Sequence, residues 1–227
     1  MCNEVFWAPL QTALPPGLTA RVVDYGDAGT ITAMAEAALA VAPAEFVLAG
    51  HSMGGRVAME VARIAPQRVS KLILMDTGYL PMSGGAADDT ERAGRMALME
   101  VARRDGVRAM CSEWVKGMVH PDRLADAALV NPILDMFAQK DAARFACQQG
   151  ALLSRPDARP VLSALTMPTM LLCGRQDSWA SVAQHEAMQK LAPHASMCVI
   201  EDAGHMVLME QPDATARAIL DFCAAGA

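Results

Sequence analysis

One short stretch restricts the fold of this chain more than any other. The sequence G-H-S-M-G-G at 50–55 follows an apolar run over 46–49 and precedes an amphipathic run. The first run predicts a buried strand and the second a helix, so Ser52 falls on the turn between them. Such a turn holds the serine hydroxyl above the edge of the sheet. We expect Gly50 and Gly54 to be required, because side chains there would collide with the neighbouring strand and helix.

A glycine-rich turn with a purely structural serine would show the same short pattern. The context favours a functional serine, because the small residues Gly54, Gly55 and Ala58 stand where the helix must approach the sheet. If Ser52 is a nucleophile, the backbone N–H of Met53 points to the place where an oxyanion would form.

Strand and helix patterns alternate at both ends of the chain. The expected strands cover 20–23, 46–49, 71–76, 170–174 and 197–200, and the expected helices cover 30–40, 53–64, 182–191 and 214–223. The run at 71–76 is nearly all apolar, which is typical of a strand covered on both faces. This alternation predicts an α/β fold with a mostly parallel sheet.

The middle of the chain has a different pattern. Helical periodicity dominates from about 78 to 164, and this block carries no strand signal. We therefore expect a core formed by 1–77 and 165–227, interrupted by an all-helical cap insertion at 78–164.

Composition excludes several classes of function. The net charge of −6 and the pI near 5.3 argue against binding to nucleic acid or to an anionic membrane surface. The six cysteines are scattered without metal-ligand spacing, which suits a reducing cytoplasm. The first twenty residues lack the features of a signal peptide, and no apolar run is long enough to span a bilayer. We expect a cytoplasmic protein that acts on a small molecule without a cofactor.

The predicted serine nucleophile needs a base, and the base needs an orienting acid. Asp177, in C-G-R-Q-D at 173–177, follows one predicted strand, and His205 follows the next. The carboxyl ends of parallel strands lie at the same edge of a sheet, where sites gather. The chain order Ser, Asp, His is also the order expected of a nucleophile elbow. We therefore expect Ser52, Asp177 and His205 to meet.

Alternatives remain for each partner of the serine. Asp76 also ends a strand and could be the acid, while Asp177 could instead cap the helix that begins near Ser181. His205 could be an ordinary surface-loop histidine.

The other histidines are expected to have lesser roles. His51 lies inside the turn and is expected to be structural, whereas His185 and His194 are expected to be solvated. His120, in the helical insertion, could line a pocket.

Four segments of the chain resemble a known family. They are A-G-H-S-M-G-G at 49–55, A-P-Q-R-V-S-K-L-I-L-M-D-T at 65–77, C-G-R-Q-D at 173–177 and E-D-A-G-H-M-V-L-M-E-Q-P at 201–212. Together they resemble a small, esterase-like bacterial α/β-hydrolase-fold serine hydrolase with a helical cap. The resemblance covers nearly the whole chain and is loosest in the cap. Members of this fold that are haloalkane dehalogenases or epoxide hydrolases carry Asp at the nucleophile position, so Ser52 excludes them.

The resemblance implies roles for four residues. Ser52 is expected to be the nucleophile, His205 the base and Asp177 the orienting acid. The N–H of Met53 is expected to be one of the two oxyanion donors.

The resemblance also implies strands that this sequence lacks. The family carries two or three strands before the segment at 20–23, and one ends in a His-Gly or Pro-Gly loop that supplies the second oxyanion N–H. The segment at 4–9 resembles the helix after that loop. We expect either a start codon further upstream or a shortened form, in which Met1 or Cys2 is nearest to the missing donor.

The expected activity is hydrolysis of a small carboxylic ester through an acyl-enzyme. A thioester hydrolase or a C–C bond hydrolase could use the same three residues. A non-catalytic binding protein of the same fold is a further alternative.

Overall fold

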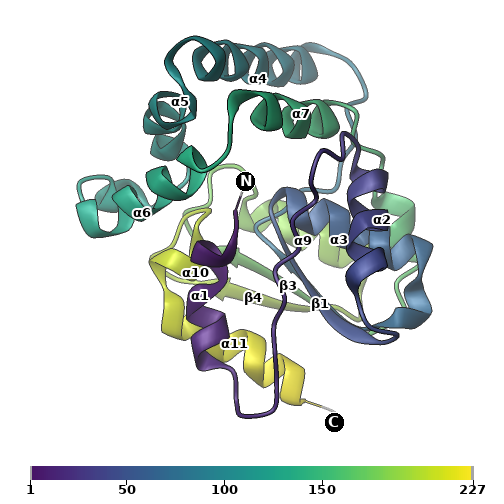
Figure 1. The fold of residues 1–227 in the computed structure, drawn as a ribbon. Coiled ribbons are helices and arrows are strands. Elements are labelled where there is room, and N and C mark those ends of the chain that lie inside the picture. Colours follow the sequence, from purple (N-terminus) through teal and green to yellow (C-terminus); the bar gives the residue numbers. More distant parts are fainter. Residues whose placement is uncertain (1, 226–227) are drawn as a thin grey trace.

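The computed structural model describes residues 2–225 and contains one parallel sheet with helices on both faces (Figure 1). The strands lie in the order β1-β2-β3-β4, and each neighbouring pair is parallel. Their bounds are β1 Phe46–His51, β2 Val69–Met75, β3 Thr169–Gly174 and β4 Ser196–Ile200. This architecture confirms the predicted α/β fold with a mostly parallel sheet.

Helices make up most of the remaining structure. The α-helices are α1 Glu4–Ala13, α2 Ile31–Val41, α3 Met53–Ile64, α4 Ala86–Asp105, α5 Val107–Trp114, α6 Ala127–Ala138, α7 Ala142–Leu153, α8 Arg159–Ser163, α9 Val182–Leu191, α10 Val207–Glu210 and α11 Pro212–Ala224. Short 3₁₀ turns cover Pro66–Arg68, Val115–Gly117 and Pro121–Arg123. Within 2–225, no helix combines the length and apolar character needed to cross a bilayer.

Two apolar layers enclose the sheet. On one face α1, α10 and α11 pack together, and α2, α3 and α9 cover the other face (Figure 1). Strand β2 contributes to both layers, because successive side chains of a strand point to opposite faces. Ile73 and Met75 join the core on the α1 side, whereas Leu72 and Leu74 join the core on the α3 side. All four are completely buried, as the apolar run in the sequence predicts.

The predicted strand at 20–23 is wrong. Residues 14–30 contain no strand, and the segment after α1 crosses the β1 side of the sheet as a coil (Figure 1). A strand needs a hydrogen-bonded neighbour, and no backbone hydrogen bond joins 20–23 to β1. Among the described residues β1 pairs only with β2. It is therefore an edge strand, and its Val47 is 45% exposed.

The chain between β2 and β3 is helical, as predicted. We call α4–α7, residues 86–153, the cap; it stands beyond the carboxyl ends of the strands (Figure 1). Side chains of Asp126 and Asp141 cap the first turns of α6 and α7, and Gly106, with φ of 89°, separates α4 from α5. The short helix α8 packs against α3 and α9 instead of joining the cap.

Candidate active site

Ser52 stands on a strained turn between β1 and α3. Its φ of 55° and ψ of −118° lie outside the regions that residues with side chains usually adopt. Two hydrogen bonds hold the strained residue: its N–H donates to the carbonyl of Met75 at 2.9 Å, and Thr77 Oγ1 donates to its carbonyl at 2.7 Å. Strain of this kind persists only where the surrounding structure enforces it, and it gathers at functional sites.

The glycines of the turn are not equivalent. A Cβ at Gly50 would lie 2.2 Å from the carbonyl oxygen of Gly54, so Gly50 is required as expected. A Cβ at Gly54 would meet only the Tyr25 hydroxyl, at an ordinary 3.6 Å, so the expected collision there is wrong. Gly55 is the second required glycine, because its Cβ would lie 2.6 Å from the Thr77 side chain.

The imidazole of His205 bridges Ser52 and Asp177. Its Nε2 lies 2.9 Å from Ser52 Oγ, and its Nδ1 lies 2.8 Å from Asp177 Oδ2. The other carboxylate oxygen of Asp177 accepts the N–H groups of Trp179 and Ala180 at 2.8 and 3.0 Å. Burial alone would raise the pKa of Asp177, but His205 and these donors hold that pKa far below its usual range. The carboxylate is therefore charged and aimed at the imidazole.

Asp177 does not cap the following helix. The side chain of Ser181 caps α9 by accepting the N–H of Gln184. The three residues expected to meet therefore lie together at the carboxyl edge of the sheet. Their catalytic roles remain a prediction.

Asp76, the alternative acid, is buried in a different environment. Its Oδ1 accepts the N–H of Gly174 at 2.9 Å, and no donor within the described chain reaches its Oδ2. The nearest cation-forming atom is Nε2 of His51, at 3.8 Å. Burial, with the charge of Asp177 second, raises the pKa of Asp76 well above its usual range. None of its hydrogen bonds joins it to His205.

His51 is structural, as expected. Its Nε2 donates to the carbonyl of His205 at 2.7 Å, and its Nδ1 lies 3.7 Å from Cys2 Sγ. Burial, with the nearby His205 second, lowers the pKa of His51 to about 3, so the ring stays neutral. This side chain supports the backbone of the predicted base.

The expectation that His185 is solvated is wrong. The side chain is completely buried, and its Nδ1 lies 3.1 Å from the carbonyl of Ser181. Its helix turns this face toward the core, where Nε2 accepts the N–H of Thr77 at 3.5 Å. His194 is exposed, as expected. His120 is not among the residues that line the cavity described below.

The loop that carries His205 is held by the segment between α5 and α6 of the cap. Two N–H groups, those of His205 and Met206, donate to the carbonyl of Met118 at 2.6 and 3.2 Å. Glu210 then bridges the two segments, accepting the N–H of Gly204 at 2.9 Å and that of His120 at 2.6 Å. Sequence reasoning missed Glu210, because an acid five residues after the histidine carries no signal without these partners.

A cavity of about 1440 Å³ opens above Ser52 and His205. Its walls include Trp179, Cys2 and Met53, and it extends along β1 to the coil at 20–23. Met53 is the first residue of α3, and N–H groups there have no acceptor within their helix. That N–H is therefore free to face a developing oxyanion. Met1, named above as a nearest candidate for a second donor, lies outside the described residues.

Comparison with known proteins identifies the family. Residues 17–212 match the family model described as the alpha/beta hydrolase fold. The chain belongs to the α/β hydrolase fold family. The parallel sheet, the strained serine after β1 and the helical cap between β2 and β3 are all consistent with that membership.

Individual α/β hydrolases resemble the chain over most of its length. It is 27% identical to a pimeloyl-[acyl-carrier protein] methyl ester esterase of Xanthomonas campestris pv. campestris, over 96% of this chain and 90% of that protein. It is also 27% identical to a Haemophilus influenzae protein, over 78% of this chain, and spans only 60% of that protein. The solved structure of a thermophilic esterase from Thermogutta terrifontis superposes with a TM-score of 0.80 at 25% identity, covering 97% of this chain and 85% of that one.

Proposed function

We propose that this protein is a serine hydrolase that cleaves a small carboxylic ester through an acyl-enzyme intermediate. The observation that carries the proposal is the pair of hydrogen bonds that links Ser52, His205 and Asp177, at 2.9 and 2.8 Å. The relatives reported above support it, because two of them are named as esterases.

The geometry suits a two-step reaction. Ser52 Oγ attacks the ester carbonyl carbon while His205 Nε2 takes the hydroxyl proton, and Asp177 stabilises the imidazolium that forms. The oxyanion faces the N–H of Met53. The tetrahedral intermediate then collapses, and the alcohol leaves with the proton held by His205. Water repeats the sequence on the acyl-enzyme, releasing the carboxylic acid and restoring Ser52.

The domain organisation assigns separate tasks to the core and the insertion. Residues 1–77 and 165–227 supply the three reacting side chains, whereas the insertion at 78–164 supplies cavity walls such as Trp114 and Gln149. The bond-breaking chemistry therefore belongs to the core, and both parts of the chain line the cavity that would receive the substrate.

A serine-directed fluorophosphonate probe tests the proposal. The wild-type protein should react with the probe and hydrolyse p-nitrophenyl butyrate, and Ser52→Ala should abolish the labelling and lower turnover by about 10³-fold or more. Ser112→Ala is the matched control, because Ser112 is exposed on the cap and its hydroxyl donates to the carbonyl of Arg108. A folded wild-type protein that neither reacts nor turns over any ester or thioester would overturn the proposal in favour of a binding protein.

A further inference from the structure

A group of arginines lines the cavity beside the proposed nucleophile. Arg56 lies on α3, one helical turn after Ser52, and Arg155 follows the end of α7. Arg56 Nη1 and Arg155 Nε both donate to the carbonyl oxygen of Leu80, at 3.0 and 2.9 Å. Because they share one acceptor, the two guanidinium groups are close neighbours. Arg95 of α4 lines the same cavity.

The carboxylates do not balance these charges. Glu91 accepts two hydrogen bonds from Arg155, at 2.5 and 2.8 Å, and another from Arg95 at 2.8 Å. One carboxylate therefore serves two guanidinium groups. Arg56 forms no ion pair with any carboxylate of the described chain, and its hydrogen-bond acceptor is the neutral carbonyl of Leu80.

The other nearby acid is already engaged. Asp88 also lines the cavity, but its Oδ2 accepts the N–H groups of Ser83 and Gly84 at 2.6 and 2.7 Å. Burial, with the charge of Arg155 second, lowers the pKa of Arg56 to about 9. A partly buried cation without a counterion is costly, and an anionic ligand would relieve that cost.

Gly78 provides the space that Arg56 occupies. A Cβ at Gly78 would lie 2.7 Å from Arg56 Nη2, so even alanine there would displace the guanidinium. The adjacent residue, Thr77, holds the carbonyl of Ser52. One segment of the chain therefore fixes both the nucleophile and the unpaired arginine.

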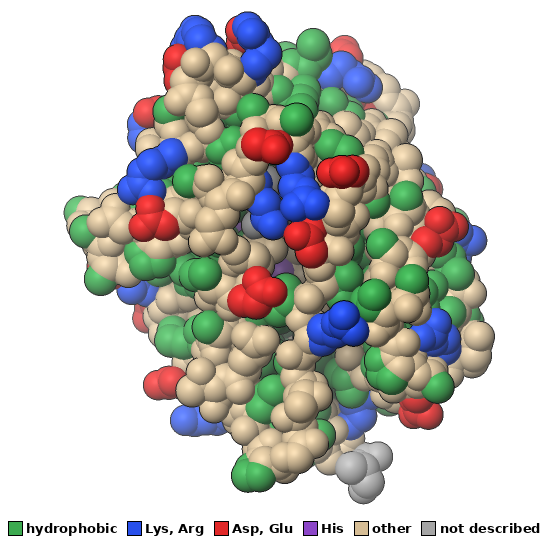
Figure 2. All heavy atoms as spheres, viewed as in Figure 1, with side chains coloured by type: hydrophobic (Ala, Val, Ile, Leu, Met, Phe, Trp, Pro, Cys, Tyr) green, Lys and Arg blue, Asp and Glu red, His purple; other side chains and the backbone are tan. Residues whose placement is uncertain are grey.

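The molecular surface agrees with this arrangement. Figure 2 shows a hollow near the centre of the view, with Lys and Arg side chains gathered inside it, a histidine deeper within, and acidic side chains around its rim. The cavity that reaches Ser52 and His205 is lined by Arg56, Arg95 and Arg155. A substrate entering here meets positive charge before it reaches the serine.

We propose that Arg56 binds an anionic group of the substrate, a carboxylate or a phosphoryl group, while Ser52 attacks the ester. This inference rests on the proposed function and names its substrate class. The backbones of Ser52 and Arg56 are separated by four residues, about 6 Å along the helix axis, and both residues line the same cavity, so one small substrate can reach both. The monoester of a short dicarboxylic acid is such a substrate.

Paired substrates test the assignment. The wild-type enzyme should hydrolyse monomethyl adipate with a higher kcat/KM than methyl hexanoate, the neutral ester of the same chain length. Arg56→Met should raise KM for monomethyl adipate by about 10–100-fold, the size expected when a charge-assisted hydrogen bond is lost. The same variant should change kcat/KM for methyl hexanoate by less than about threefold.

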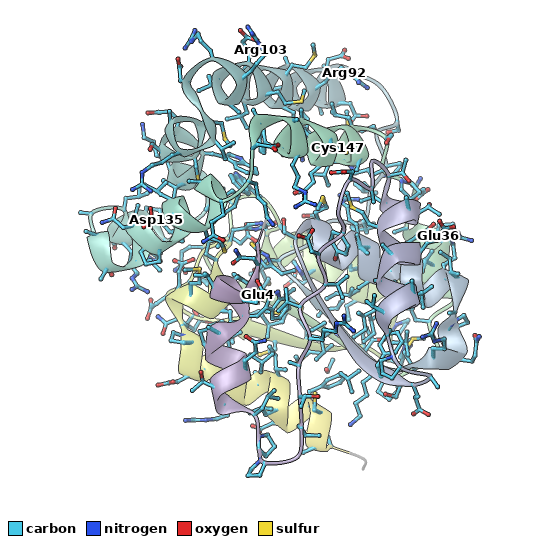
Figure 3. The ribbon with its side chains drawn as sticks, in the orientation of Figure 1. Glu4, Glu36, Arg92, Arg103, Asp135 and Cys147 are labelled. Atoms are coloured by element: carbon cyan, nitrogen blue, oxygen red, sulfur yellow. The ribbon has the colours of Figure 1, made fainter. Side chains whose placement is uncertain are left out.

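Three further variants sharpen the test. Arg56→Lys should recover part of the loss, because it restores the charge but not the guanidinium geometry. Gly78→Ala should reproduce the selective loss by displacing Arg56. Arg92→Met is the matched control, because Arg92 is exposed on α4, the helix at the top of Figure 3, and does not line the cavity. Its kinetics should match those of the wild type.

The outcomes separate this inference from the proposed function. If the wild type hydrolyses none of these esters, p-nitrophenyl butyrate included, and does not react with the fluorophosphonate probe, the proposed function fails. If it hydrolyses p-nitrophenyl butyrate but neither methyl ester, only the anion site is overturned. If it turns over both but Arg56→Met affects them equally or not at all, the anion site is overturned and the esterase stands. Methyl 4-phosphonobutanoate distinguishes the two anions: a larger Arg56→Met effect on this ester than on monomethyl adipate identifies a phosphoryl-type ligand.

Discussion

Two neighbouring strands of the sheet each end in a buried aspartate, and the two carboxyl groups have different surroundings. Asp76 follows β2 and is 0% exposed, and Asp177 follows β3 and is 3% exposed. Asp177 has three donors: Trp179 and Ala180 from the loop after β3, and His205 from the loop after β4. Asp76 sits on a tight turn with φ of 45° and receives one donor. Equal burial therefore does not imply equal chemistry.

The difference in donors sets the charge of each group. Hydrogen bonds and His205 favour the ionised form of Asp177 and lower its pKa, whereas burial near another carboxylate favours the protonated form of Asp76 and raises its pKa. A carboxylate that orients a base must be charged, so the environment of Asp177 suits that role.

The largest expected effect is on catalysis. Asp177→Asn should lower kcat for p-nitrophenyl butyrate by about 10⁴-fold, because an amide no longer favours the required tautomer of the base. Asp76→Asn, the matched change on the neighbouring strand, should keep kcat within about tenfold of wild type. A greater loss in Asp76→Asn than in Asp177→Asn would reverse the assignment of the acid.

The next expected effect is on the free energy of unfolding, at Gly174, the residue that donates to Asp76 and ends the strand before Asp177. The N–H of Gly174 donates to Asp76, and a Cβ on Gly174 would lie 2.2 Å from the carbonyl oxygen of Gly204. Gly174→Ala should therefore cost about 4 kcal/mol or more of unfolding free energy in urea. Gly150→Ala, in open space on α7, should stabilise the protein by about 0.5–1 kcal/mol. Equal stabilities would show that the close approach at Gly174 is absent.

A smaller effect is expected on the pH dependence of the free energy of unfolding, through Asp177. Its folded-state pKa is lowered, so its contribution to stability is present above the unfolded pKa of about 3.8 and is lost as the pH falls. Asp177→Asn should be about 2 kcal/mol less stable than wild type at pH 7, and the gap should narrow below pH 4. Urea unfolding titrations of both proteins between pH 7 and pH 3 measure this difference in stability. A constant gap would contradict the charge assigned to Asp177.

The smallest expected effect is on the pH dependence of stability through Asp76, and its sign is opposite to that for Asp177. The folded-state pKa of Asp76 is raised, so its protonated form contributes stability below pH 3.8 that is lost as the pH rises. The titratable groups near it include Asp177, His51, Glu210, Cys173 and Cys2. Asp76→Asn should match wild type near pH 3.5 and be more stable by about 1 kcal/mol at pH 7. If the stability of Asp76→Asn relative to wild type falls between pH 3.5 and pH 7, the raised pKa assigned to Asp76 is wrong.

The sequence predicted most of the fold, because the elements that form are those with strong periodicity. The helix expected at 182–191 has those bounds as α9, and the apolar runs at 71–76 and 170–174 became β2 and β3. The exception at 20–23 has a physical cause. The four residues A-R-V-V at 20–23 do not form a strand by themselves, and whether a neighbouring strand is available depends on parts of the chain far from them.

The site was predicted less completely, because the missing information concerns distant partners. Strand-end positions indicated Ser52, Asp177 and His205, but left Asp76 open until the donors around each carboxylate were known. The unpaired charge of Arg56 depends on Glu91 of α4 and on Arg155, which follows α7. No local pattern in the sequence reports which guanidinium groups share a carboxylate.

The bonds between Met118, Glu210 and the His205 loop have a consequence for protein engineering. Exchanging caps is a natural way to build new specificities on one catalytic scaffold. Here a graft that replaces 118–120 could displace the Met118 carbonyl, which accepts the N–H of His205. It could also displace the His120 N–H, which donates to Glu210. Because residues 118–120 lie between α5 and α6, inside the cap, a chimera should keep this segment from the scaffold and exchange the helices on either side of it. The useful boundary is set by hydrogen bonds, not by where the helices end.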